Sequence, residues 1–289
     1  MKNYIWYVGL AAVSFLPVPF VLYKKRKTYP VSTMMIYYLF ATGMTWIAEF
    51  TVLGMFNSYE YRTGLYTSPW AQNLMGHLFL NATMYPAAGL IMVTCSLKYR
   101  WTALVAAIFV AIEYIYVKLG LYAHYWWRYY MSVITVFIFI AISRRWFLKM
   151  IKPRRRSIRA VVFYFVAMFI IHIPSPLLLL YGRTSYTMEW IYQKVQDIYI
   201  TSIIITFFYH LLESFLLVLV TCILKNPKWK IVPFIVSPAV QILFVRTGIM
   251  VVKNGWKPVY TILINVVFIA AFMIVEKNTL KLSTEESSG

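Results

Sequence analysis

Acidic residues are scarce in this sequence, and so is charge of any kind. Nine Asp and Glu stand against 28 Lys and Arg, and only 13% of the 289 residues are charged. Soluble globular domains carry about 25% charged residues, so this composition excludes an ordinary soluble protein. The two cysteines, Cys95 and Cys222, are too few for a disulfide framework.

Familiar catalytic motifs are also absent. The sequence contains no GxSxG nucleophile elbow, no Walker loop and no Rossmann glycine fingerprint, which excludes the common soluble enzyme classes. The four histidines, His77, His124, His172 and His210, are scattered along the chain, whereas a zinc site needs three or four converging ligands. We predict no metal and no cofactor. An intramembrane lipid-modifying enzyme is not excluded by these absences.

Apolar residues dominate what is present. They make up 61% of the chain, and the mean hydropathy is +0.68. Segments of about 20 apolar residues span a bilayer as helices, because hydrocarbon satisfies no free backbone group. The fold class is therefore all-α, a polytopic membrane protein. We predict nine spans, at about 4–22, 31–56, 69–96, 101–119, 129–146, 158–181, 196–224, 229–249 and 258–275.

The cations predict the orientation of these spans. With the N-terminus outside, the inner segments carry 19 Lys and Arg and the outer segments carry nine. This asymmetry favours an N-out, C-in topology. The first span is followed, not preceded, by its basic residues, so we interpret it as a retained helix and not as a signal peptide. Residues 278–289 form a polar tail.

A basic segment at the midpoint, residues 144–159, holds eight of the 28 cations. In a soluble protein it would suggest nucleic-acid binding, but apolar spans flank it, so we interpret it as a cytoplasmic hinge at residues 151–157 and predict no nucleic acid. Three consecutive arginines exceed what a hinge needs. We predict that Arg154, Arg155 and Arg156 bind anionic lipid or a protein partner.

An internal repeat is visible across this hinge. The segment from Thr94 to Trp101 reappears from Thr221 to Trp229 with one inserted residue, and Ser58-Tyr59 matches Ser185-Tyr186 at the same offset of 127. The sequence therefore predicts a lead helix at 1–30 and two four-helix units, at 31–150 and 158–277. Because four is even, the two units have parallel orientation.

The first unit also carries a pattern of aromatic, proline, cysteine and acidic residues. Its members are Tyr85, Pro86, Cys95, Trp101, Glu113, Trp127 and Tyr130. This pattern resembles an uncharacterised multi-pass membrane family of spore-forming Gram-positive bacteria, whose members are typically little longer than one unit. The resemblance implies a doubled member in a bacterial cytoplasmic membrane. It implies no activity, and it is loose in the second unit, where Gln241 replaces the equivalent of Glu113.

Polar residues inside spans are expensive and often functional. Ser202, Thr206, His210 and Glu213 recur on one face of the seventh span, and the i, i+3 spacing predicts a His210–Glu213 pair that relays a proton or bonds two helices together. A second stripe on the third span has the same spacing of four. It consists of Asn73, His77 and Asn81.

The remaining charged and amide groups fall toward the outer side. They are Glu49, Glu113, Lys118, Gln241 and Arg246. We expect Glu113 to pair with Lys118 or Arg246, because buried ions need partners. The alternative is an outward vestibule for a charged or zwitterionic solute.

Three functions follow from these features. The first is a small permease or ion- or proton-coupled carrier built on the two stripes. The second is an assembly or sensor protein that binds anionic lipid, a protein partner or a second copy of the chain. The third is an intramembrane lipid-modifying enzyme.

Overall fold

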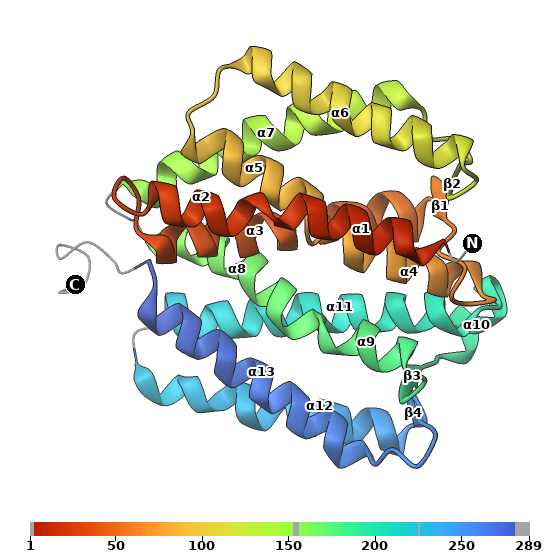
Figure 1. Cartoon of the computed structure of the whole chain (residues 1–289). Helices are drawn as coiled ribbons and strands as arrows, with labels where there is room; N and C mark the ends of the chain where they lie inside the picture. The colour runs from red at the N-terminus through yellow and green to blue at the C-terminus, as the bar shows by residue number, and fades with distance from the viewer. Residues whose placement is uncertain (1–2, 153–155, 225, 281–289) are drawn as a thin grey trace. The chain divides into compact units, whose positions relative to one another are not determined.

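The computed structural model describes residues 3–152, 156–224 and 226–280. The chain divides into two compact units, unit 1 (residues 1–154) and unit 2 (residues 155–289), and the division falls inside the basic hinge. The lead helix packs within unit 1 against α4 and α5. Each unit is a bundle of helices with a pair of short strands at one end (Figure 1).

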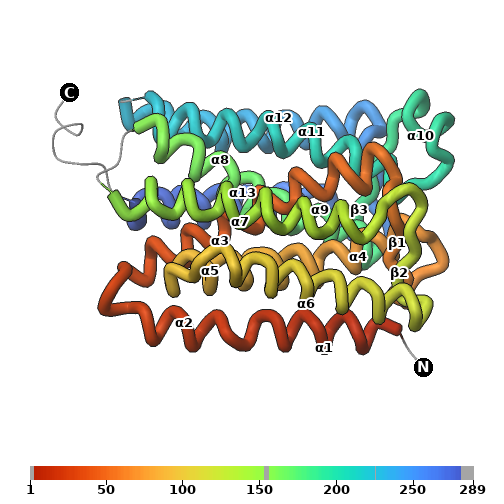
Figure 2. The backbone as a smooth tube through the Cα atoms, turned by 90° about the horizontal axis from the view of Figure 1, so that it is seen from above, coloured from red at the N-terminus to blue at the C-terminus, as the bar shows by residue number. Residues whose placement is uncertain are grey.

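Unit 1 is built around α5, which contacts most of the other helices of the unit (Figure 2). Its elements in order are α1 (Tyr4–Phe15), α2 (Pro17–Lys25), α3 (Val31–Glu49), a π-helical turn (Phe50–Met55), β1 (Tyr59–Tyr61), α4 (Pro69–Leu80), α5 (Met84–Thr94), α6 (Tyr99–Lys118), β2 (Tyr122–His124) and α7 (Tyr129–Ile151).

Unit 2 has its own core, formed where α8 packs against α11 and α13. Its elements are α8 (Arg156–His172), α9 (Pro174–Leu180), β3 (Thr184–Tyr186), α10 (Glu189–Val195), α11 (Ile198–Val218), a π-helical turn (Leu219–Ile223), a 3-10 turn (Pro227–Ile231), α12 (Val232–Arg246), β4 (Met250–Val252) and α13 (Pro258–Asn278).

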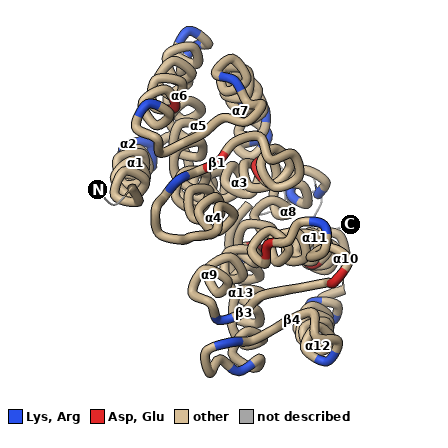
Figure 3. The backbone as a smooth tube through the Cα atoms, turned by 90° about the vertical axis from the view of Figure 1, so that its right-hand side faces the viewer, with Lys and Arg blue, Asp and Glu red and all other residues tan. Residues whose placement is uncertain are grey.

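Eight helices in the described part of the chain are long and apolar enough to cross a membrane. They are α1 with α2, α3 with its π turn, α6, α7, α8 with α9, α11 with its π turn, the 3-10 turn with α12, and α13. The protein is therefore an α-helical membrane protein. Viewed along the helices, charged positions are sparse (Figure 3), as a hydrocarbon environment requires.

The remaining predicted span, residues 69–96, is interrupted between α4 and α5. The interruption frees backbone carbonyls, and side chains of α3 bond two of them: Thr45 donates to the carbonyl of Asn81 at 3.1 Å, and Tyr38 donates to that of Ala82 at 2.7 Å. Such replacement bonds are what allows a broken helix to exist inside a bundle.

No strand was predicted, yet each unit forms one antiparallel pair. In unit 1, β1 pairs with β2 so that Tyr61 lies opposite Tyr122; in unit 2, β3 pairs with β4 so that Tyr186 lies opposite Met250. Gly120 and Gly248 both adopt positive φ just before the second strand of their pair, where a helix ends in a left-handed residue.

The first strands occupy the same place in the two units. Each ends in a tyrosine whose backbone N–H donates to a side chain of a later helix: Tyr61 to Asn73 at 2.7 Å, and Tyr186 to Ser202 at 2.8 Å. Strand position therefore matches Tyr61 with Tyr186. The sequence offset of 127 instead matches Tyr59 with Tyr186.

The helix ends opposite the strands are closed by two arginines of the basic segment. Arg144 donates to the carbonyl of Leu97 and stacks over Tyr99 at 4.4 Å. Arg159 is buried and forms an ion pair with Glu276 at 2.5 Å. These two cations are therefore committed to their own units and do not contribute free charge to the hinge.

Candidate functional site

Glu49 is the centre of a polar site in unit 1. It lies at the end of α3, where the helix widens into the π turn, a deviation often found at functional sites. The hydroxyl of Tyr59 donates to Glu49 Oε2 at 2.5 Å, and that of Tyr61 donates to Oε1 at 3.1 Å. Alternation along β1 explains the arrangement, because residues two apart in a strand point to the same face.

The strand tyrosines are held as hydrogen-bond donors. Burial and the neighbouring Glu49 carboxylate raise the pKa of Tyr59 and of Tyr61 well above the ordinary value for tyrosine. Both phenols therefore remain protonated at neutral pH. Glu60, between them in sequence, faces the other way and accepts from Tyr125 at 2.8 Å.

Close packing fixes the position of Tyr61. A Cβ placed on Gly76 of α4 would lie 2.5 Å from the Cγ of the Tyr61 ring, so only glycine fits there. The ring of Tyr61 also lies 5.3 Å from that of Tyr122 on the paired strand. The sequence of α4 thus sets the depth at which the tyrosine side chain sits.

Glu113 of α6 is the second acidic group of this site. Its Oε1 lies 2.6 Å from Nε2 of His124, on β2, and both side chains are nearly buried. The expected pairing with Lys118 is wrong for the described residues, because Lys118 lies instead near the ring of Tyr114 at the exposed end of α6. The actual partner depends on strand pairing, which no sequence pattern indicated.

Two small cavities of about 100 and about 140 Å³ lie beside these groups. Glu49 and Tyr59 line both, and Glu113 lines the smaller one. Aromatic rings form much of the remaining wall. Those of the smaller cavity are Tyr59, Tyr61, Tyr85, Phe109, Tyr116, Tyr122 and Trp127.

The predicted second stripe borders this site. Asn73 holds the backbone of Tyr61, and Asn81 lines both cavities. His77 lies between them, 3.1 Å from the Asn81 amide through Nδ1, with its ring 5.0 Å from that of Trp46. The stripe thus positions β1 and the helix interruption, and one of its members reaches the cavity wall.

The predicted central stripe lies in unit 2 and is buried, but its members have separate roles. Ser202 bonds Tyr186, and Thr206 donates to the carbonyl of Ser202 at 2.7 Å. His210 does not pair with Glu213. Its Nδ1 lies 2.8 Å from Nδ1 of His172, and its Nε2 lies 3.5 Å from the hydroxyl of Ser175.

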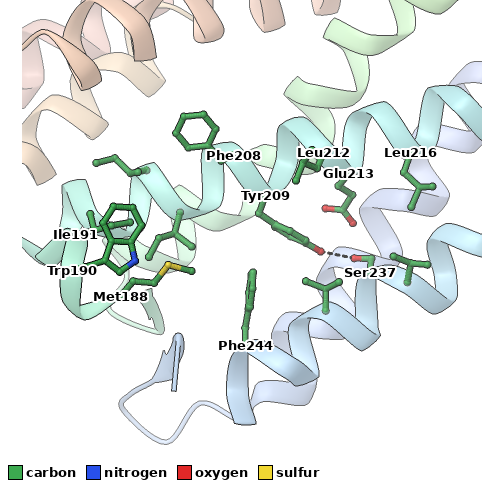
Figure 4. A pocket seen from close by; sticks show the side chains of 14 residues that line it. Met188, Trp190, Ile191, Phe208, Tyr209, Leu212, Glu213, Leu216, Ser237 and Phe244 are labelled. Carbon is green, nitrogen blue, oxygen red and sulfur yellow. Dashed lines mark hydrogen bonds between the residues drawn. The ribbon is translucent and has the colours of Figure 1, made fainter. Parts of the chain in front are cut away.

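The prediction of a direct His210–Glu213 pair is therefore wrong. Sequence spacing showed that both residues face inward, but positions three apart on a helix also diverge by about 60° around its axis. That divergence is enough to direct His210 toward α8 and α9, and Glu213 toward α12, as Figure 4 shows for Glu213. His172, the partner of His210, was not predicted as a site residue, because a periodic pattern does not show which helices are neighbours.

The other members of the predicted outer cluster belong to unit 2. Gln241 is buried on α12, and Arg246 lies exposed at the end of that helix. The structure thus brings Glu49 and Glu113 to one cavity but does not place the two cations Lys118 and Arg246 among buried groups.

The arginine cluster is described only in part. Arg156 begins α8 and is partly buried, whereas Arg154 and Arg155 lie outside the described residues. Within the described ranges, no three His, Cys, Asp or Glu side chains converge as metal ligands would. No family model matches the chain, and neither a curated protein nor a solved structure shows significant similarity to it.

Proposed function

We propose that the protein is a carrier of small organic cations and that the aromatic cavities of unit 1 bind the cation. The observation that carries this proposal is the meeting of Glu49 and Glu113 with several aromatic rings around one cavity. Aromatic cages attract ammonium groups through the negative faces of their rings, and a carboxylate supplies the compensating charge. A cavity near 100 Å³ accommodates a methylated ammonium but not a bulky solute.

The two acids have different roles in this proposal. Glu113 already has His124 as a partner, whereas Glu49 receives hydrogen bonds from two neutral phenols. Among the described residues Glu49 forms no ion pair, so a bound cation would supply the positive charge that the site lacks. The tyrosines orient the carboxylate without neutralising it.

For the carrier we propose nine spans in an N-out, C-in orientation, with α4 and α5 together forming the ninth. The excess of cations in the inner segments supports the orientation. Unit 2 and the part of unit 1 after the lead helix share the order helix, strand, two helices, strand and helix, when α4 with α5 and α8 with α9 are each counted as one helix and α10 is set apart. This common order supports two tandem parallel repeats. We place the protein in a bacterial cytoplasmic membrane, with anionic lipids around its inner ends.

The proposal is tested with labelled choline and methylammonium. Purified full-length protein in phosphatidylcholine nanodiscs is assayed for equilibrium binding, and proteoliposomes are assayed for uptake. We expect saturable choline binding that Glu49→Gln reduces at least tenfold, because the amide removes the carboxylate charge to which the two phenols donate.

Glu60→Gln is the matched control, because Glu60 lies on the same strand and faces away from the cavity. Choline binding should survive this change. Equal binding by wild type and Glu49→Gln, or the absence of binding and uptake for both probes, would refute the proposal.

A further inference from the structure

A further cavity, in unit 2, is larger than the two cavities of unit 1 and much more apolar. It is a groove of about 520 Å³ between α10, α11 and α12, and its walls are almost entirely apolar (Figure 4). Leu212 and Trp190 stand at its edge, with 72% and 64% of their surfaces exposed. In a membrane protein such an edge is accessible to apolar chains of the surrounding lipid.

The floor of this groove carries a buried carboxylate whose oxygens accept no hydrogen bond from the described residues. Glu213 is 4% exposed, and neither of its carboxylate oxygens has a hydrogen-bond partner among the described residues. Tyr209 and Ser237 line the groove beside it, and their hydroxyls share one hydrogen bond of 2.8 Å (Figure 4).

Two buried amides extend this set. The carbonyl oxygens Oε1 of Gln241, on α12, and Oδ1 of Asn265, on α13, are likewise without a partner in the described part of the chain. Asn265 lies near the Glu213 carboxyl, and Gln241 lies near the Tyr209 hydroxyl. Glu213 and Asn265 thus present unpaired acceptor oxygens near one another, and burying acceptors without donors is unfavourable.

We infer that the groove binds a hydrophobic primary amine, with its alkyl chain along the apolar walls and its ammonium group at Glu213. A primary ammonium supplies both a positive charge and N–H donors for the unpaired carboxylate oxygens of Glu213. None of the described lining residues is Lys or Arg, so the groove offers nothing to the phosphate of a phospholipid. The inferred ligand is therefore an amine without an anionic group.

This site is independent of the proposed cation site in unit 1, and it should discriminate differently. Dodecylamine should bind, because it carries donors. Dodecyltrimethylammonium has the same charge and chain but no N–H, so it should bind at least tenfold more weakly. Dodecanol lacks the charge and should not bind measurably.

The experiment uses the full chain in phosphatidylcholine nanodiscs, with bound amphiphile counted by native mass spectrometry. Glu213→Gln should reduce dodecylamine binding at least tenfold. Glu189→Gln is the control, because Glu189 lies exposed on α10, where it bonds Gln193. An unfolding free energy no lower than that of wild type, measured in mixed micelles titrated with sodium dodecyl sulfate, would show that the variant folds.

Val236→Trp provides a second variant, because a large ring at this groove-lining position fills part of the groove while Glu213 stays intact. It too should reduce dodecylamine binding. Three results would each overturn the inference: dodecylamine binding that both variants leave unchanged, dodecanol binding as tightly as dodecylamine, or phosphatidylethanolamine binding in preference to the simple amine.

Discussion

Glu49 of unit 1 and Glu213 of unit 2 are both acidic residues of membrane helices, but their surroundings differ. In unit 1, β1 supplies two phenol donors to Glu49. In unit 2, β3 has a single tyrosine, and the backbone of that tyrosine is bonded by Ser202 instead. The carboxylate oxygens of Glu213 have no hydrogen-bond partner among the described residues. The comparison teaches that the short strands, not the helices, decide whether the acid of each unit has donors.

The largest expected effect concerns the helix ends opposite the strands. There it is unit 2 that gives a buried acidic residue a partner, the reverse of the contrast between Glu49 and Glu213. Unit 2 is closed there by the buried Arg159–Glu276 ion pair, and unit 1 by a bond from Arg144 to a neutral carbonyl. Arg159→Met leaves Glu276 buried without its counter-charge, which costs about 3–5 kcal/mol of unfolding free energy.

The measurement is reversible unfolding in mixed micelles titrated with sodium dodecyl sulfate. Lys277→Met, at an exposed position near the same helix end, is the control and should change the unfolding free energy little. A loss below about 1 kcal/mol for Arg159→Met would mean that the pair contributes no more than a surface ion pair does.

A smaller effect is expected in unit 1. Glu49→Gln replaces the charged acceptor of two tyrosine hydroxyls by a neutral amide, and hydrogen bonds to charged groups contribute about 1.5–3 kcal/mol. We therefore expect unfolding in the same micelles to become easier by roughly half to all of that amount. A variant as stable as wild type would show that the two bonds are weak and that the acid is not held by β1.

The smallest effect should have the opposite sign. Glu213→Gln brings two amide N–H donors to a position near Asn265, whose Oδ1 has no partner in the described part of the chain. One new hydrogen bond is worth about 0.5–1.5 kcal/mol, so the ligand-free variant should be more stable than wild type by about that much. Destabilisation would mean that Glu213 is satisfied in the apoprotein, and the contrast between the two acids would then fail.

Much of the fold could be predicted from the sequence. The eight candidate spans begin and end within a few residues of the predicted ranges, because apolar run length and terminal proline are local properties. The interruption at 81–83 has a local signal in Pro86, which has no N–H to donate to the carbonyl of Ala82 four residues earlier. Tertiary bonds from Thr45 and Tyr38 support it, and such bonds leave no periodic trace.

The candidate site could be predicted only in its membership. Periodicity correctly placed His210 and Glu213 on a buried face, and counting residues placed Glu49 and Glu113 toward the same side. Partners were not predictable, because they depend on how each helix is rotated and on strands of three residues. His124 and Tyr59 belong to the site because β1 pairs with β2, and the sequence did not predict that pairing.

The pairing of β1 with β2 also bears on how fast a cation could exchange. Tyr59 and Tyr61 line the cavity of unit 1 from a ladder of only two three-residue strands. An isolated two-stranded pair is marginally stable, so separating it is far cheaper than unfolding a helix. Local opening of this kind occurs on timescales from about a microsecond to a second. For the proposed carrier, separation of β1 from β2 would open the cavity, and the lifetime of the paired state would limit turnover.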